Sequence, residues 1–206
     1  MDNEKILEKV EKYVKKSCLN DSTGHDWYHI ERVKNISLII NEEEKKDVFI
    51  IKMIATLHDL YDHKFYNGDI YLAIKNLFKE LDIIKYLSNE EIENIAMSCK
   101  NIGFTENKKE KKTLSIEGKI VQDADKIDAL GAIGVARAFA TGSKLNNLLY
   151  DPTSNNSKTT INHFYDKLLK LKDSMNTKCG KRIAEERHNY IERYLRDFFD
   201  EWNGYK

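Results

Sequence analysis

The chain has 206 residues, in which 34 lysines and arginines balance 34 aspartates and glutamates, so its formal net charge at pH 7 is zero. This length allows one domain with a well-buried core, and the lack of a net positive field argues against nucleic acid or an anionic membrane as the main partner. Three widely spaced cysteines without a CxxC motif indicate neither a disulfide framework nor a zinc ribbon. Residues 1–16 lack the apolar core of a signal peptide. We therefore expect a cytoplasmic protein that binds neither membranes nor nucleic acid.

The first half of the chain shows apolar residues at helical spacing, and its single proline lies much later, at position 152. We expect a first helix up to about Lys16 and a second from Asp26, acting as N-cap, to about residue 44. Asp47 is the expected N-cap of a third helix over residues 48–60, which is apolar almost all round, as in a central buried helix. Val48–Ile51 alone also fits a strand, but the apolar run continues without a breaker, which favours a helix.

Further helices follow the same reasoning. One is expected after Gly68-Asp69, running to about Leu81, and the next begins at a capping-box pattern formed by Ser88 and Glu91. Segments 101–113 and 142–158 are expected loops, and segment 115–140 is expected to form one helix in which Gly131 and Gly134 allow close packing. Two helices complete the chain, and we interpret the aromatic stripe of the last one as core. The sequence thus predicts an all-α fold in one domain, residues 1–206, with a core of about 20–140 on which C-terminal helices of about 159–203 pack.

His58 and Asp59 end the most apolar predicted helix. Burying an unpaired carboxylate there would cost several kcal/mol, and a divalent cation would compensate while also fixing the imidazole tautomer. A buried His–Asp hydrogen bond without metal is the alternative, since buried charges are also satisfied by Arg or Lys. The dipeptide alone leaves both interpretations open.

Two other segments favour the metal. His29 lies inside the second predicted helix, with Arg32 one turn later on the same face. Asp123, Asp125 and Asp128 lie in a segment that is otherwise apolar and small, and a solvated helix face explains three such acids poorly. Asp125 and Asp128 share a helix face, from which Asp123 diverges.

The resulting set of two imidazoles and two carboxylates consists of His29, His58, Asp59 and Asp125. Mixed nitrogen and oxygen donors suit Mn²⁺, Fe²⁺, Co²⁺ or Ni²⁺, whereas Mg²⁺ prefers more oxygen and structural Zn²⁺ more sulfur. If the helix register differs from the one assumed here, Asp123 is the ligand in place of Asp125.

The ordered pattern His29-x-x-Arg32, His58-Asp59 and Asp125 resembles the H…HD…D signature of the HD-domain metal-dependent phosphohydrolases. Segments 24–33, 57–65, 120–137, 162–169 and 184–188 are similar to the YedJ/YpgQ-like bacterial branch of that superfamily, so the resemblance covers most of the chain. Each short motif is weak alone, and the ordered set is strong.

This resemblance implies an HD-domain helical bundle with a C-terminal helical extension and favours Asp125 over Asp123. It implies one divalent metal ion per chain, with Mn²⁺ preferred and Mg²⁺, Co²⁺, Ni²⁺ or Fe²⁺ as other options. Binuclear relatives carry additional His ligands, and the sequence contains no such spaced set; His63 is the only nearby candidate for a second site.

Roles for the neighbouring residues follow from phosphoryl-transfer chemistry. Asp62, one turn beyond His58, is the candidate general base or water-orienting acceptor, or it simply ends the helix. Lys64 and Arg32 are candidate phosphate-binding cations, or else surface or supporting side chains. Asp128 is expected either to brace His29 or Arg32 or to contact substrate. His25 and Asp26 are interpreted as shaping the start of the second helix.

The expected substrate is a small phosphate compound, a nucleotide by resemblance to the family, and a homodimer is possible. Our leading expectation is a nucleoside triphosphate pyrophosphohydrolase. A nucleotide phosphomonoesterase or cyclic nucleotide phosphodiesterase is the alternative enzyme. A non-catalytic nucleotide or metal sensor is the alternative of another class, although a sensor has no need of an acid and a cation beside the metal.

Overall fold

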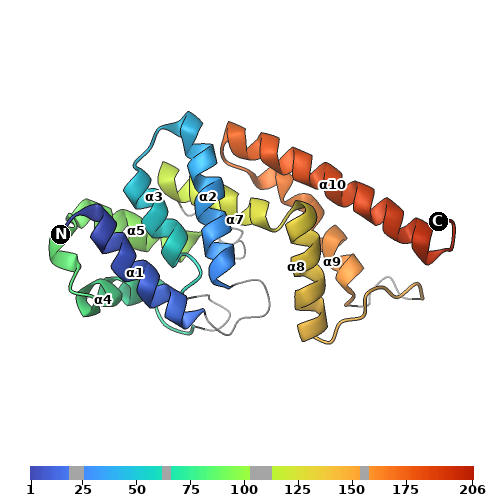
Figure 1. Ribbon diagram of the computed structural model, residues 1–206, viewed down its shortest axis with the longest axis horizontal. Coiled ribbons are helices and arrows are strands. Elements are labelled where there is room, and N and C mark those ends of the chain that lie inside the picture. The colour runs from blue at the N-terminus through green and yellow to red at the C-terminus, as the bar shows by residue number, and fades with distance from the viewer. Residues whose placement is uncertain (19–25, 62–65, 103–112, 154–157) are drawn as a thin grey trace. The chain divides into compact units, whose positions relative to one another are not determined.

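The structure is a computed structural model that describes the chain except for residues 19–25, 62–65, 103–112 and 154–157. Within the described part, regular structure is helical, and the sole β-type pairing there is an isolated bridge between Leu148 and Thr159. The predicted all-α fold is therefore confirmed (Figure 1). Among the described helices, none is long and apolar enough to cross a membrane.

The chain forms two compact units, the first ending at Ala124 and the second running from Asp125 to Lys206. The boundary falls inside one continuous helix, so the two units share a structural element. Each unit is described separately below, and the single-domain organisation stays a prediction.

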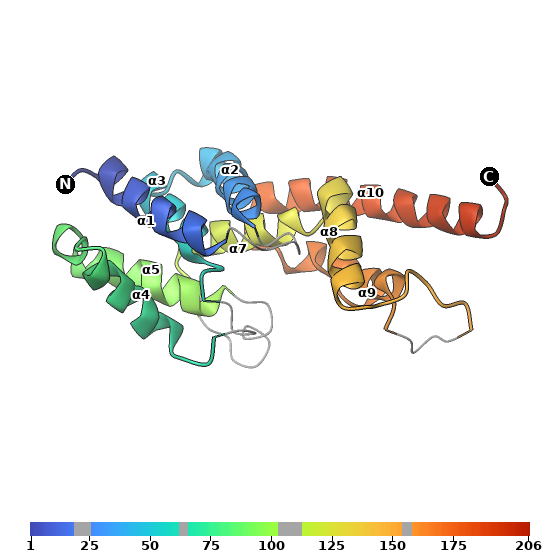
Figure 2. The same cartoon turned by 60° about the horizontal axis from the view of Figure 1, so that its bottom comes forward.

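The first unit is built around α3 (Val48–Leu57), in which eight of ten residues are buried. This helix packs against its neighbours α1 (Asn3–Ser17), α2 (Trp27–Glu44) and α5 (Asn89–Asn101), while α4 (Ile70–Glu80) packs against α5 (Figures 1 and 2). A short 3₁₀ turn, η1 (Ile84–Tyr86), connects α4 and α5. An apolar helix surrounded by amphipathic helices explains why its sequence is hydrophobic on all sides.

The predicted helix starts of this unit are confirmed. Asp26, Asp47 and Asp69 each accept a hydrogen bond from a backbone N–H in the first turn of their helix. Ser88 and Glu91 form the reciprocal capping box at the start of α5. These short polar side chains satisfy backbone donors that a helix leaves unpaired, which is why they fix where each helix begins.

The helix that joins the units, α7, spans Ile116–Asp128. The second unit continues with α8 (Gly131–Lys144), which packs against α9 (Thr160–Asp166) and the long α10 (Lys178–Trp202). Two 3₁₀ turns, η2 (Leu168–Lys170) and η3 (Lys172–Ser174), lie between α9 and α10. The chain between α8 and α9 is closed by two hydrogen bonds, from Thr160 N–H to the Leu148 carbonyl at 2.9 Å and from Ile161 N–H to the Leu149 carbonyl at 3.0 Å.

The prediction of one helix over residues 115–140 is wrong. The chain turns after Asp128 and resumes as α8 at Gly131, whose φ of +70° lies in the left-handed region. We call this turn the α7–α8 elbow (residues 128–131). It requires glycine at 131 for its backbone conformation, and also at 134 in α8, because a Cβ on Gly134 would lie 2.2 Å from the Ala129 carbonyl oxygen. The apolar periodicity hides the break because Leu130, inside the elbow, is itself buried.

Three smaller expectations also need correction. α3 ends at Leu57, not residue 60, and the loop expected from residue 142 starts later because α8 continues to Lys144. In α10, Ile191 and Leu195 are buried as expected of core, but Tyr190 and Trp202 are exposed.

Candidate metal centre

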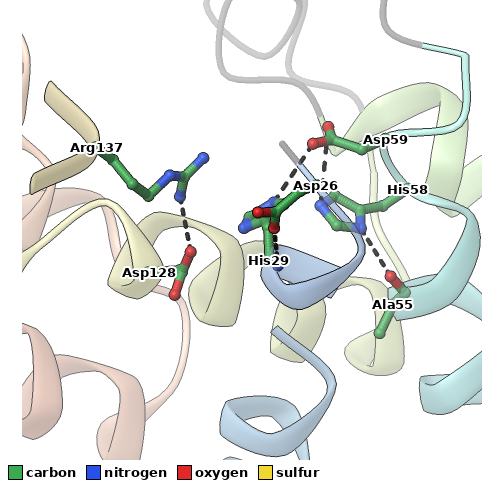
Figure 3. Close-up of polar contacts among 7 residues, drawn as sticks. All are labelled: Asp26, His29, Ala55, His58, Asp59, Asp128 and Arg137. Carbon is green, nitrogen blue, oxygen red and sulfur yellow. Dashed lines mark hydrogen bonds and ion pairs between the residues drawn. The ribbon is translucent and has the colours of Figure 1, made fainter. Parts of the chain in front are cut away.

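His29 is placed by the first turn of α2. The Asp26 carboxylate accepts a hydrogen bond from the His29 backbone N–H at 2.9 Å, which fixes the start of the helix (Figure 3). Asp26 therefore shapes this helix start, as the sequence predicts. The His29 side chain itself is fully buried.

His58 and Asp59 follow α3 directly, in the turn at its C-terminal end. The Nδ1 atom of His58 lies 2.8 Å from the carbonyl oxygen of Ala55 (Figure 3). Because a carbonyl can only accept, Nδ1 carries the proton when the ring is neutral, and Nε2 then has the lone pair that binds a metal. The rings of His29 and His58 lie 5.3 Å apart between centroids.

The Asp59 carboxylate faces both imidazoles. One oxygen lies 3.4 Å from His29 Nε2 and the other 3.8 Å from His58 Nε2 (Figure 3). Both distances exceed the roughly 2.7–3.2 Å of an N–H···O hydrogen bond. They are the distances expected between neighbouring ligands of one ion.

Asp125, on α7, is brought close to both histidines. One ligand atom from each of His29, His58 and Asp125 lies within 4.8 Å of the other two. Ligand atoms bonded to one ion at about 2.0–2.2 Å lie within about 4.4 Å of one another, so the three donors need only a small adjustment to bind a cation. Asp59 and Asp123 are outside this mutually close group.

These residues fit a divalent cation by donor type and by spacing. Two nitrogen donors and one or two carboxylates converge, and the histidines are buried while Asp125 is half-buried. A cation there offsets the carboxylate charges, whose burial is otherwise unfavourable.

The other sequence-derived residues divide into two groups. Arg32 lies on α2 one turn after His29 and is half-buried. Asp128 is fully buried and accepts an ion-paired hydrogen bond from Arg137 at 2.8 Å. Four further candidates lie outside the described residues: Asp62, Lys64, His25 and His63.

Two further residues, Arg137 and Tyr61, were not identified as candidates from the sequence. Arg137 was missed because a continuous helix would have placed it far from Asp128. Tyr61, three residues after His58, has its pKa raised to about 12, first by burial and then by the nearby Tyr13 and Tyr66. Its hydroxyl therefore remains protonated across the physiological pH range.

The fold and this cluster of donors agree with the comparison to known proteins. The family model for the HD domain matches residues 26–130, a span that contains His29, His58, Asp59 and Asp125. The chain therefore belongs to the HD-domain family, in the class of HD-superfamily hydrolases.

Individual relatives place it more closely. The chain is 38% identical to the uncharacterized protein YpgQ of Bacillus subtilis, over 93% of this chain and 91% of YpgQ. A crystal structure of an HD-superfamily hydrolase from Bacillus thuringiensis is 40% identical, with a TM-score of 0.76 and coverage of 98% of this chain and 99% of that one. The structure of B. subtilis YpgQ in complex with ADP has a TM-score of 0.78 at 34% identity, covering 98% of this chain and 97% of that one.

Proposed function

We propose that this protein is a divalent-metal-dependent phosphohydrolase, and that its reaction converts nucleoside or deoxynucleoside triphosphates to monophosphates and pyrophosphate. The convergence of His29, His58 and Asp125 within 4.8 Å carries the metal-dependent part. The nucleotide part is supported by YpgQ, a relative similar over almost its whole length, whose crystal structure contains ADP.

The proposed site binds one metal ion through His29, His58, Asp59 and Asp125, with Mn²⁺ as the preferred ion. Such an ion polarises a phosphoryl oxygen and lowers the pKa of a water. His58 can bind the ion through Nε2, because the Ala55 carbonyl keeps the imidazole proton on Nδ1. Arg32, one turn after His29, is the proposed phosphate-binding cation of α2, since guanidinium groups bind phosphate through paired N–H donors.

Asp62 and Lys64 keep the roles that the sequence gives them in this proposal. Asp62 accepts a proton from the attacking water or orients it, and Lys64 binds substrate phosphate. We expect Asp62→Ala to retain metal binding but to lower turnover by about 10²-fold or more. Calorimetric titration with Mn²⁺ alongside steady-state kinetics measures both quantities, and loss of metal binding in this variant would identify Asp62 as a ligand instead.

The product distinguishes this function from its alternatives. Purified protein stripped with chelator and reloaded with Mn²⁺ is incubated with nucleoside tri-, di- and monophosphates and cyclic nucleotides. Pyrophosphate release from triphosphates is the expected result. Orthophosphate release from monophosphates identifies a phosphomonoesterase, and opening of a cyclic nucleotide identifies a phosphodiesterase. Saturable nucleotide binding without turnover, with any of Mn²⁺, Mg²⁺, Co²⁺, Ni²⁺ or Fe²⁺, identifies a sensor.

A further inference from the structure

The ion pair between Asp128 and Arg137 exists because of the α7–α8 elbow. In one continuous helix, residues nine positions apart are separated by about 13.5 Å along the axis and lie on opposite faces. The break after Asp128 turns α8 back, so that Arg137 Nη1 reaches the Asp128 carboxylate at 2.8 Å (Figure 3). The fold thus brings a cation to a position that the linear sequence does not indicate.

This position is next to the proposed metal ligand Asp125. Asp125 and Asp128 are three residues apart on α7, and residues at that spacing share a helix face with about 5–6 Å between their Cβ atoms. Since Arg137 binds Asp128 directly, its guanidinium lies about one helical turn from Asp125. A di- or triphosphate held at the metal would have to extend over about one helical turn to meet this guanidinium.

Arg137 keeps hydrogen-bonding capacity after binding Asp128. A guanidinium has five N–H donors, and within the described part of the chain Asp128 is the one partner that Arg137 has. The Arg137 side chain is mostly buried but keeps 14% of its surface exposed, so it is partly accessible to a ligand. Asp128, by contrast, is fully buried, and so it holds the guanidinium in place without being able to contact substrate itself.

The end of α7 is anchored by other cations as well. Lys126 Nζ donates to the Ser174 carbonyl at 2.8 Å, and Arg187 Nη1 donates to the Ile127 carbonyl at 2.9 Å. Arg187 also packs its aliphatic atoms near Gly131. Because these two residues already tie the helix end to the rest of the second unit, Arg137 is not needed for that purpose alone.

We propose that Arg137 is a substrate-binding residue that contacts a phosphate group of the nucleotide, and that Asp128 is the positioning residue that orients it. This inference rests on the proposed phosphohydrolase function and names a cation of its substrate site. The fully buried Asp128 carboxylate fixes the planar donor fork of the partly exposed Arg137 guanidinium. This lowers the entropy lost when the fork binds phosphate.

The test compares Arg137→Gln with the matched control Arg193→Gln, an exposed arginine on α10. Affinities for Mn²⁺, and then for ADP and inorganic pyrophosphate on the Mn²⁺-loaded protein, are measured by calorimetry. We expect Arg137→Gln to bind Mn²⁺ within about twofold of wild type and both phosphate probes about tenfold or more weakly. Arg193→Gln is expected to match wild type in all three titrations. Equal probe affinities for Arg137→Gln and wild type, or equal losses in both variants, would overturn the inference.

Asp128→Asn tests the positioning role. It is expected to weaken probe binding in the same direction, and its effect combined with Arg137→Gln should be clearly less than the sum of the single effects, because the residues act as a unit. Additive losses contradict this coupling.

If Arg137→Gln or Asp128→Asn fails to fold, as judged by circular dichroism, Arg137→Lys is used to test the inference. It retains the charge but not the fork, so weaker probe binding supports the inference and unchanged binding overturns it.

The outcomes separate this inference from the proposed function. Turnover of nucleotides with an unchanged KM and unchanged probe affinity in Arg137→Gln keeps the function and rejects the role of Arg137. Pyrophosphate binding that depends on Arg137, in a protein that hydrolyses no nucleotide, rejects the function and keeps the phosphate subsite.

Discussion

The carbonyl of Ala55 determines the chemistry of His58 through a single contact. Because the acceptor is main chain, it cannot be altered by substitution and cannot itself change protonation state. Most metal-binding histidines are oriented in this way, by a carboxylate or carbonyl at the second ring nitrogen. His58 is therefore preorganised for metal binding.

Removal of Asp59 tests the ligand set at the level of one residue. We expect Asp59→Ala to abolish metal binding and hydrolysis together, because it removes the carboxylate that faces both imidazoles. Asp173→Ala, at an exposed position in η3, is the control that removes a carboxylate elsewhere. Calorimetric titration with Mn²⁺ and a product assay give the two readouts. Full activity in Asp59→Ala would refute its assignment as a ligand.

Gly131 sets the geometry of an entire element junction. We expect Gly131→Ala to destabilise the fold by about 1–2 kcal/mol from the left-handed backbone alone, with an added cost because the new Cβ would lie 3.1 Å from Arg187 Cγ. Gly204→Ala is the matched control, since Gly204 has a φ of +73° but no atom within 4 Å of a new Cβ. Urea unfolding of both variants measures the difference. A smaller loss for Gly131→Ala than for Gly204→Ala would contradict the crowding argument.

The start of α4 gives a pH-dependent prediction. The hydrogen bond from Lys100, followed by those from backbone N–H groups of the first turn, lowers the pKa of Asp69 below its ordinary value. A lowered folded-state pKa means that the charged form contributes stability above the unfolded-state pKa, and that this contribution is lost as pH falls through the folded-state value.

Asp69→Asn isolates this charge, because asparagine caps a helix about as well as aspartate. We expect its melting temperature to be about 1–2 °C below wild type at neutral pH, as for an exposed ion pair in a protein of this size. The difference should disappear in acid below the usual carboxyl range. Thermal melts across pH measure this, and a difference that is constant with pH would exclude the ion pair as its cause.

Elements were predictable where a local signal marks them. Asp26, Asp47, Asp69 and the Ser88–Glu91 pair mark helix starts through contacts within four residues, so the sequence contains the whole signal. The α7–α8 elbow has local signals too, in the left-handed Gly131 and in the close approach of Gly134 to Ala129, but apolar periodicity continues across it and masks the break. The contact between Gly131 and Arg187, residues far apart in sequence, cannot be deduced from a local pattern.

Metal binding should stabilise the whole molecule, because the proposed ligands come from α2, the turn after α3, and α7. A ligand that binds only the folded state adds about 2.7 kcal/mol at a concentration of 100 Kd, or roughly 5–10 °C in melting temperature for a chain of this size. We expect Mn²⁺ to raise the melting temperature of chelator-treated protein and excess chelator to reverse the rise. Asp59→Ala should show no such shift, and an equal shift in that variant would place the ion elsewhere.

The candidate site was predictable in part. His29, His58 and an acid among residues 123–128 were identifiable because donor residue types in apolar surroundings require an explanation. The choice of Asp125 over Asp123 came from the resemblance to the HD-domain family, and the structure brings His29, His58 and Asp125 together. The partner of Asp128 was not identifiable, since a buried carboxylate in sequence indicates that a cation is needed but not which one. Arg137 becomes its partner only through the direction in which the chain leaves the elbow.

A pair of main-chain hydrogen bonds closes the segment between α8 and α9 at its two ends. Loop-closure entropy grows only slowly with length, so foreign sequence inserted after Thr153 should be accommodated, because Tyr150 then keeps its ring contacts with α10. A fluorophore-labelled or affinity-tagged version made at this point would leave both chain ends unmodified. The insertion would also lie far along the sequence from every proposed metal ligand, so the tagged protein could be immobilised through it.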